Sequence, residues 1–181
     1  ADESDGSFSR LNPTVAVVTN IDPEHLDHHG SFDQLKQAFR DFVASIPFYG
    51  FASLCIDHPT VQRMIADIPE RRIISYGFSA SADVRGINLR PDNDSMIFDA
   101  MVSKRISDQG IIEGFRLPML GDHNVLNTLA AISVCLEMGI DADKILHAVS
   151  QFKGVGRRFD RKGSVSDITI IDDYGHHPAE I

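Results

Sequence analysis

The sequence predicts an α/β fold, with a mostly parallel sheet flanked by helices and a small antiparallel hairpin subdomain. Three observations carry this prediction. The apolar, β-branched run at residues 14–19 has no polar alternation, which is typical of a strand covered on both faces. Strand-like and helix-like segments then alternate to residue 77 with short connections, which indicates right-handed parallel crossovers. Residues 83–118 alternate apolar and polar side chains between turn formers, which is typical of antiparallel hairpins.

Local signals in the first half place two helices between three strands. Residues 31–34 form a capping box, so a helix is expected after Ser31. Its core face would be made by Phe32, Leu35, Phe39, Phe42 and Val43. A strand is expected at residues 51–56. Pro59 suits the first turn of a short helix, Pro69 ends that helix, and a third strand is expected at residues 72–76.

The second half is expected to hold hairpin strands, two helices and a linker. Strand-like segments at residues 95–102 and 111–117 follow turn formers at residues 91–94 and 107–110. Apolar residues surround most of a helix expected at residues 123–138, which predicts a central, buried helix. Gly139 ends that helix and Asp141 caps the next one. A linker follows at residues 153–158, with a domain boundary near residue 156 and a new strand at residues 168–171.

Composition and charge exclude several classes of protein. The chain has 181 residues, 43% of them hydrophobic and 24% charged, which is typical of one globular domain or of one domain and part of another. No apolar run approaches the roughly 20 residues that span a bilayer. The formal net charge of -9 argues against general binding to nucleic acids or to anionic membranes.

The cysteines and the termini indicate a cytoplasmic protein. Cys55 and Cys135 lie in apolar runs, as small buried hydrophobes in a reducing compartment do, rather than in a disulfide framework. The acidic N-terminus shows no signal peptide. The chain has no initiator Met and stops at Ile181 soon after a strand-like run, so we expect it to be cut from a longer protein.

The first candidate site is the segment at residues 19–29, Thr-Asn-Ile-Asp-Pro-Glu-His-Leu-Asp-His-His, directly after the first strand. In open α/β sheets, ligands bind outside the carboxyl ends of the strands. Imidazoles beside carboxylates can ligate a divalent metal or move protons. The spacing matches no standard zinc motif, so a metal site and a solvated polar loop both remain open.

A second cluster lies at the start of the helix at residues 123–138. His123 and Asn127 are four residues apart and share a helix face, on which Asn124 is adjacent to Asn127. With the free backbone N–H groups of the first turn, these side chains could bind a base or a phosphate. The alternative is that Asp122 or Asn124 merely caps the helix, and spacing alone favours the cap.

Two further clusters lie near the expected domain boundary. Adjacent Arg157 and Arg158 could clamp a phosphate, or they could form a surface ion pair with Asp160. Residues 172–178, Asp-Asp-Tyr-Gly-His-His-Pro, gather five chemically capable side chains after a strand, which favours a site over chance. The chain contains no Gly-Lys dipeptide, and therefore no Walker A loop.

Together these clusters resemble the motifs of the Mur ligases, in the family's order and at about its spacing. The motifs are residues 1–5, Thr19-Asn20 with residues 24–27, Gly121-x-His123-Asn124 with Asn127, residues 156–160 and residues 172–178. The resemblance runs from Ala1 to Ile181 and is closest to the members that add L-alanine to UDP-N-acetylmuramate.

The resemblance implies a three-domain cytoplasmic enzyme of peptidoglycan synthesis that uses ATP and Mg²⁺. ATP would phosphorylate the muramyl carboxylate, and the amine of L-alanine would attack the acyl phosphate. Residues 1–156 would be the central ATP-binding domain without its N-terminal P-loop portion, and residues 157–181 would be the start of the C-terminal domain. The other domains of the parent chain would then be its partners.

The resemblance also implies roles for individual residues. His25 would ligate Mg²⁺ and, with Arg158, serve catalysis. Asn20 and His177 would contact substrate. The residues that would bind ATP are His123, Asn124, Asn127, Arg157, Arg158, Asp173, Tyr174 and His176.

Three alternatives remain open at this point. The chain could come from the family member that attaches a recycled peptide to the same sugar nucleotide. It could instead be a metal-dependent hydrolase that uses His25, Asp27, His28 and His29. The chain by itself could also be an inactive nucleotide-binding piece, because without a P-loop it has little to hold the β- and γ-phosphates.

Overall fold

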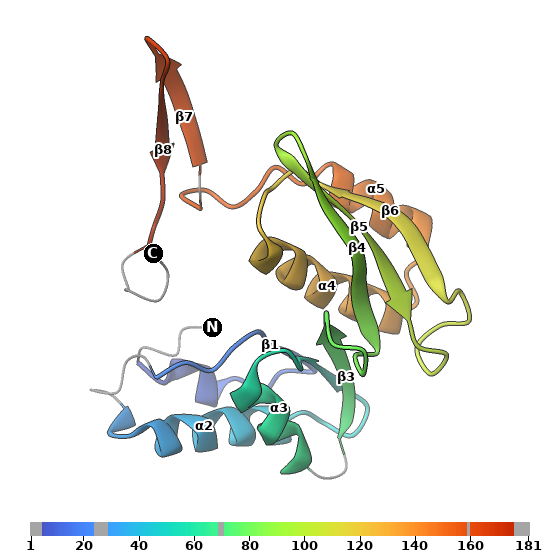
Figure 1. Cartoon of the computed structure of the whole chain (residues 1–181). Coiled ribbons are helices and arrows are strands. Elements are labelled where there is room, and N and C mark those ends of the chain that lie inside the picture. Colours follow the sequence, from blue (N-terminus) through green and yellow to red (C-terminus); the bar gives the residue numbers. More distant parts are fainter. Residues whose placement is uncertain (1–4, 24–28, 69–70, 159, 176–181) are drawn as a thin grey trace.

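The structure is a computed structural model that describes residues 5–23, 29–68, 71–158 and 160–175. Two sheets and five helices, one of them a short 3₁₀ helix, make up these residues (Figure 1). In chain order the elements are η1 (Ser7–Arg10), β1 (Val15–Val18), α2 (Phe32–Ala44), β2 (Phe51–Cys55), α3 (Pro59–Ala66), β3 (Arg72–Gly77), β4 (Val84–Asp92), β5 (Ser95–Val102), β6 (Ile111–Leu117), α4 (Asp122–Glu137), α5 (Ala142–Ser150), β7 (Asp160–Val165) and β8 (Ile168–Asp172).

The larger sheet has six strands in the order β1-β2-β3-β4-β5-β6. Strands β1 to β4 pair in parallel, whereas β4, β5 and β6 pair in antiparallel fashion. The predicted fold class is confirmed, and the hairpin segment joins the parallel strands in one continuous sheet. The junction is narrow, because β3 and β4 pair only at Tyr76↔Val84 and Gly77↔Arg85.

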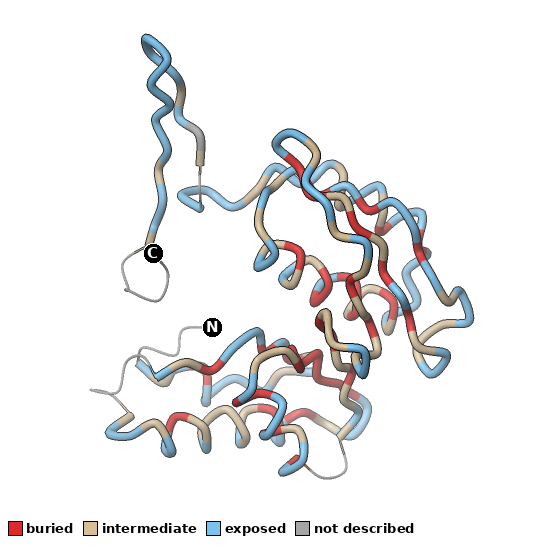
Figure 2. Tube along the Cα trace, in the orientation of Figure 1, coloured by how far each residue is buried: buried red, intermediate tan, exposed pale blue. Residues whose placement is uncertain are grey.

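Helices cover both faces of the parallel part of the sheet. Helices α2 and α3 pack on one face, where Leu35 and Val61 meet Leu54 of β2 in one core cluster. Helix α4 packs on the other face against β2, β3 and β4, and α5 packs on β6. All five residues of β2 are buried, as expected for a strand covered on both sides. Figure 2 shows buried residues gathered along this sheet and on the helix sides that face it.

Several local signals act in the structure as the sequence indicates. The Ser31 hydroxyl caps α2 by accepting a hydrogen bond from the Gln34 backbone N–H at 3.2 Å. At the end of α4, Gly139 has a φ of +75°. Its N–H donates to Leu136 O and the Ile140 N–H donates to Cys135 O, the two bonds of a Schellman motif. Glycine adopts this left-handed conformation without strain, so the helix stops there.

The caps of α4 and α5 differ from expectation. The N-cap of α4 is Gly121, with a φ of +99°, and no side chain caps this helix. The Asn124 amide instead donates backwards to Leu120 O at 2.7 Å, so the predicted cap by Asp122 or Asn124 is wrong. Asp141 is the N-cap residue of α5, but its carboxylate accepts from Lys144 rather than from the backbone. Helix α4 is buried on its sheet side only, since Leu126 and Val134 are partly exposed.

A second, two-stranded sheet follows the linker. Strands β7 and β8 form an antiparallel hairpin that stands apart from the six-stranded sheet in Figure 1. The sequence indicated β8 but not β7. All of β8 except Asp172 is exposed, including Ile168 and Ile170. None of the helices among the described residues is both long and apolar enough to cross a membrane.

Candidate functional site

The carboxyl ends of β1 and β2 bring together a chain of polar side chains. The Thr19 hydroxyl donates to Asn20 Oδ1 at 2.7 Å, and Asn20 Nδ2 donates to Asp22 Oδ2 at 2.6 Å. The other carboxylate oxygen of Asp22 lies 3.2 Å from His58 Nε2. Because β1 and β2 are parallel neighbours, the residues that follow them meet at one edge of the sheet. Asn20, to which the family resemblance gives a substrate-binding role, is therefore held in a hydrogen-bonded network.

Asp57, which precedes His58, fixes the loop after β3 at the same edge. Its carboxylate accepts the backbone N–H groups of Phe78 at 2.5 Å and Ser79 at 3.0 Å. Gly77 has a φ of +154°, and a Cβ placed there would lie 2.5 Å from Asp57 Oδ1. A side chain at residue 77 would therefore push the carboxylate away from the loop it holds.

Two buried groups near the carboxyl ends of β2 and β3, the Cys55 thiol and the Tyr76 hydroxyl, stay neutral. The Tyr76 hydroxyl donates to Val18 O at 3.4 Å. Burial raises the pKa of Tyr76 well above its usual range, and burial likewise raises the pKa of the Cys55 thiol. A nucleophilic thiolate is disfavoured at such a site, so we assign Cys55 a packing role.

The first two turns of α4 present His123 and Asn127 on the exposed side of the helix. The His123 ring folds back over Gly121, where a Cβ would lie 2.7 Å from the ring Cε1. Glycine is required at residue 121 for this contact as well as for its positive φ. The Asn124 amide donates to Leu120 O. One end of the predicted ATP-binding set is thus assembled on a single helix start.

The linker and the hairpin bring the other end of that set together. The Tyr174 backbone N–H donates to Arg157 O at 2.7 Å, and the Arg157 guanidinium lies 4.9 Å from the centre of the Tyr174 ring. The Arg158 guanidinium lies 5.9 Å from the same ring. Asp173 Oδ1 accepts the Gly175 N–H at 2.7 Å. The alternative of an ion pair between these arginines and Asp160 is not what the side chains form, since Asp160 pairs with Lys162 and Arg157 Nε lies 3.7 Å from Asp172.

Three predicted site residues, His25, His176 and His177, lie outside the described residues. Asp27 and His28 of the hydrolase alternative lie outside them too. Among the described residues, no three His, Cys, Asp or Glu side chains gather as a metal site would require. Both oxygens of Asp22 are occupied by His58 and Asn20. The described residues therefore do not by themselves fit a Mg²⁺ site.

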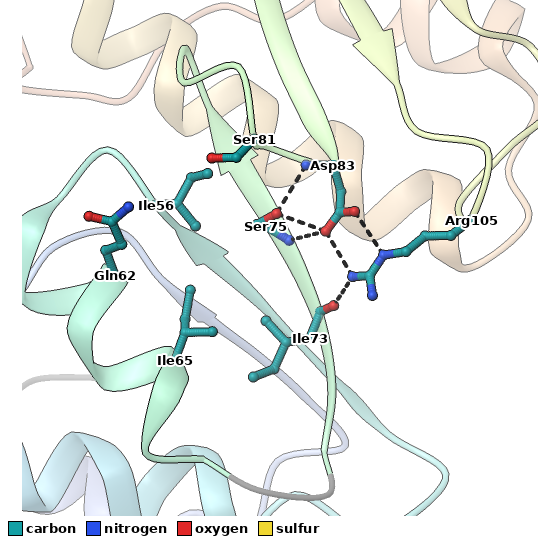
Figure 3. Close-up of a pocket in the computed structure, with 8 residues that line it drawn as sticks. All are labelled: Ile56, Gln62, Ile65, Ile73, Ser75, Ser81, Asp83 and Arg105. Atoms are coloured by element: carbon teal, nitrogen blue, oxygen red, sulfur yellow. Dashed lines mark hydrogen bonds and ion pairs between the residues drawn. The ribbon is translucent and has the colours of Figure 1, made fainter.

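A hollow of about 490 Å³ lies beside β3, with Ile56, Ile65 and Ile73 on its apolar side (Figure 3). Its polar side is the Asp83 carboxylate, which accepts from the Ser75 N–H at 2.9 Å and from Arg105 Nε at 2.7 Å. Arg105 also donates to Ile73 O. Burial of Asp83 raises its pKa. The hydrogen bonds from Arg105 and Ser75, together with the charge of Arg105, lower the pKa by more than burial raises it, so the pKa lies below its usual value.

The side chains of Asp83 and Arg105 hydrogen-bond to each other and to backbone groups of β3. Strand β4 begins opposite Tyr76, so along the preceding residues of β3 the side chains of Asp83 and Arg105 satisfy backbone groups that a neighbouring strand would otherwise pair. We therefore assign this cluster a structural role.

Sequence reasoning missed Asp57 and His58. Both follow a buried strand directly, in Cys55-Ile56-Asp57-His58-Pro59, which is the placement that marked residues 19–29 as a site. Applying the rule for carboxyl ends of parallel strands to the second strand would have found them.

Comparisons with known proteins agree with this architecture. A family model described as the Mur ligase middle domain matches residues 2–135. A UDP-N-acetylmuramate--L-alanine ligase of Cereibacter sphaeroides (strain ATCC 17025 / ATH 2.4.3) is 55% identical over 181 residues, 100% of this chain and 38% of the relative. A protein of the same name from Paracoccus denitrificans (strain Pd 1222) is 54% identical over 185 residues, 100% of this chain and 39% of the relative. The chain thus spans 38 to 39% of the length of these curated relatives.

Solved structures show the same fold. MurF from Acinetobacter baumannii superposes with a TM-score of 0.80 at 24% identity, over 97% of this chain and 37% of that one. The UDP-N-acetylmuramate-alanine ligase MurC from Thermotoga maritima superposes with a TM-score of 0.78 at 25% identity, over 99% of this chain and 39% of that one. The family match covers most of the sequence and the folds agree, so the chain belongs to the Mur ligase family.

Proposed function

We propose that this chain is part of an ATP-dependent ligase that joins L-alanine to UDP-N-acetylmuramate in the cytoplasm. The observation that carries the proposal is the 55% identity, over the whole chain, to a relative named for that reaction. Of the residues to which the family resemblance gives ATP or substrate roles, those that the structure describes lie on the carboxyl edge of the parallel strands, on one helix start and beside the linker. Ligands of open α/β sheets bind at such an edge.

We assign residues 1–156 to the central ATP-binding domain and residues 157–181 to the start of the C-terminal domain. The separate β7–β8 sheet, joined to α5 by a linker, supports this division. The matched share of the relatives supports a longer parent enzyme, in which the N-terminal portion of the central domain would supply the P-loop. On its own, the 181-residue chain is expected to turn over neither ATP nor substrate, because it has no Walker A sequence.

The proposed chemistry has two steps. A carboxylate oxygen of the muramyl group attacks the γ-phosphorus of ATP, which forms an acyl phosphate and releases ADP. The amine of L-alanine then attacks the acyl carbon, the amide bond forms, and inorganic phosphate leaves as the amine loses a proton. His25 would help to hold Mg²⁺, which would supply charge neutralisation at the transferred phosphate.

This chain's residues hold and orient the reactants. His123 and Asn127 would take the adenine end of ATP, and the Asn124 amide oxygen remains to accept a hydrogen bond, since its NH₂ group donates to Leu120. Arg158 and Arg157 would reach the phosphates from the linker, so movement of the hairpin relative to the sheet would complete the site. Asp173, Tyr174 and His176 would contact the nucleotide, and Asn20 and His177 the substrate.

The test is phosphate release by the full-length parent enzyme with Mg²⁺, ATP and UDP-N-acetylmuramate. Release that depends on L-alanine supports the proposal, and His25→Ala and Arg158→Ala should each lower kcat at least tenfold. His147→Ala and Arg63→Ala are matched controls, because both residues are exposed and neither belongs to the proposed site, and should leave kcat unchanged.

Three outcomes would contradict parts of the proposal. Release that depends on a tripeptide instead of L-alanine would identify the ligase that recycles peptides. Hydrolysis without ATP would favour the metal-dependent hydrolase. Unchanged turnover in both site variants would show that the site assignment is wrong even if the reaction is right.

A further inference from the structure

We infer that His58 is a positioning residue that fixes the orientation of the Asn20 amide through Asp22. The inference rests on the proposed function for its consequence, because there Asn20 contacts the UDP-linked substrate. Its structural part stands on the contacts at the carboxyl edge. No residue of the loop after β2 was assigned to the site from the sequence.

The three side chains form a continuous relay between two loops. His58 Nε2 lies 3.2 Å from Asp22 Oδ1, and Asn20 Nδ2 donates to Asp22 Oδ2 at 2.6 Å. His58 comes from the loop after β2, whereas Asn20 and Asp22 come from the loop after β1. The His58–Asp22 contact therefore ties the second loop to the first.

The surroundings of His58 determine which ring nitrogen carries the proton. His58 Nδ1 is buried and has no hydrogen-bond partner among the described residues. A proton on Nδ1 would be a buried N–H donor without an acceptor, which costs more than an unprotonated Nδ1 without a donor. The neutral tautomer with the proton on Nε2 is therefore favoured. In this tautomer His58 donates to Asp22, which keeps that carboxylate aimed at Asn20.

His58 is not needed as a helix cap. It occupies the N-cap position of α3, but its side chain makes no capping hydrogen bond. Pro59 at the first position of the helix already favours a helix start there. The imidazole, with 21% of its side-chain surface exposed, is thus committed to Asp22 rather than to α3.

The relay leaves the Asn20 amide in one orientation. A flipped amide would set Oδ1 against the Asp22 carboxylate, which is repulsive, whereas the observed Nδ2 donates to it. The second hydrogen of Nδ2 and the remaining lone pair of Oδ1 are then presented in fixed directions. A substrate that hydrogen-bonds Asn20 meets a preorganised group, which lowers the entropy lost on binding.

The first experiment compares three variants of the 181-residue chain by hydrogen exchange of the backbone amides at residues 19–22. In His58→Gln, the amide Nε2 replaces the ring Nε2 and can still donate to Asp22. In His58→Asn, the amide Nδ2 takes the place of the ring Nδ1 and does not reach the Asp22 carboxylate. In His58→Ala, the side chain has no donor. Exchange should be about three- to tenfold faster in His58→Ala and His58→Asn, which is the change expected when one hydrogen bond is lost. In His58→Gln it should stay near the wild-type rate.

His147→Ala, at an exposed histidine of α5, is the control and should leave exchange at residues 19–22 unchanged. Equal protection in all three His58 variants and the wild type would overturn the inference. Equal loss of protection in His58→Gln and His58→Ala would overturn it too, because the position of the donor would then not matter.

The second experiment uses the full-length parent enzyme. His58→Ala should raise KM for UDP-N-acetylmuramate about three- to tenfold and leave KM for L-alanine unchanged, with rescue in His58→Gln. In an Asn20→Ala background, His58→Ala should have little further effect, because its action passes through Asn20. Additive effects of the two changes, or a rise confined to KM for ATP or L-alanine, would overturn the inference. If the wild-type enzyme shows no release that depends on L-alanine, the proposed function fails, and the exchange data still decide the positioning role.

Discussion

Replacing Asp83 with alanine is expected to destabilise the chain by about 3 kcal/mol, because its carboxylate substitutes for a strand partner at the edge of β3. Five hydrogen bonds reach this carboxylate, from the Ser75 N–H and hydroxyl, the Ser103 hydroxyl, and Arg105 Nε and Nη2. Only 14% of the Asp83 side-chain surface is exposed. The loss of these five hydrogen bonds leaves the partly buried Ser75 backbone N–H without an acceptor.

The magnitude follows from which of these partners can return to water. The Arg105 side chain is 58% exposed, so it can be rehydrated, and its share of the loss is small. The Ser75 N–H lies on the part of β3 that precedes its pairing with β4, and leaving such a donor unsatisfied costs about 1–3 kcal/mol. The two serine hydroxyls add roughly 0.5–1.5 kcal/mol between them. Asp83→Asn keeps one acceptor oxygen and should lose about half as much.

The assay is urea unfolding of the purified chain, followed by circular dichroism. Asp92→Ala is the matched control, because Asp92 also pairs with an arginine, Arg116, but both side chains are nearly half exposed. That exposed pair should contribute about 0–1 kcal/mol. A loss in Asp83→Ala no larger than in Asp92→Ala would refute the assignment of Asp83 to the edge of β3.

Three further predictions concern the core, one close backbone approach and acid stability. The Ser133 hydroxyl donates to Ala130 O and accepts from the Ser53 hydroxyl at 2.5 Å. In urea unfolding, Ser133→Ala should lower the free energy of unfolding by about 1–3 kcal/mol and Ser53→Ala by less. The double variant should lose less than the sum of the two single losses, because the two residues share one hydrogen bond. Gly50→Ala would place a Cβ 2.1 Å from Thr14 O and should lower stability by about 1–3 kcal/mol, whereas Gly156→Ala, in open space, should change it by less than about 0.5 kcal/mol. Asp83 and Asp99 have pKa values below their usual range, the first through Arg105 and Ser75 despite burial, the second through Asn88 and the Gly114 N–H. They therefore stabilise the fold above about pH 4 and lose this contribution as the pH falls through their folded pKa values, so acid unfolding should be shallower in Asp83→Ala.

Elements with a strong local signal could be predicted from the sequence. The apolar run at β1 and the Ser31 capping box each depend on a few neighbouring residues, and the strand and the cap both form. The prediction that the strand is covered on both faces is wrong, because β1 is at the edge of the sheet and Val17 is 43% exposed. Strands β5 and β6 begin and end at the predicted residues, since their alternation is bounded by clear turns. Such signals are short-range, so one sequence suffices to detect them.

Other features depend on distant partners and carry no local signal. Strand β7 has the polar sequence Asp-Arg-Lys-Gly-Ser-Val and forms by pairing with β8. Asp22 and His58 are 36 residues apart and meet only because β1 and β2 lie side by side in parallel. The Asp83 carboxylate has its role only because β4 begins opposite Tyr76 and leaves the earlier residues of β3 without a strand partner on that side. Each requires knowledge of which strands are neighbours, which pattern analysis of one chain does not supply.

The most direct test of the proposed ligase follows oxygen from the substrate carboxylate. The full-length parent enzyme is given UDP-N-acetylmuramate labelled with ¹⁸O in its carboxylate, together with ATP, Mg²⁺ and L-alanine. If the carboxylate is phosphorylated and the amine then displaces phosphate, each released inorganic phosphate carries one carboxylate oxygen. We expect labelled phosphate, formed only when L-alanine is present and in equal amount to the amide product. Unlabelled phosphate, or phosphate release that does not depend on L-alanine, would contradict the proposal.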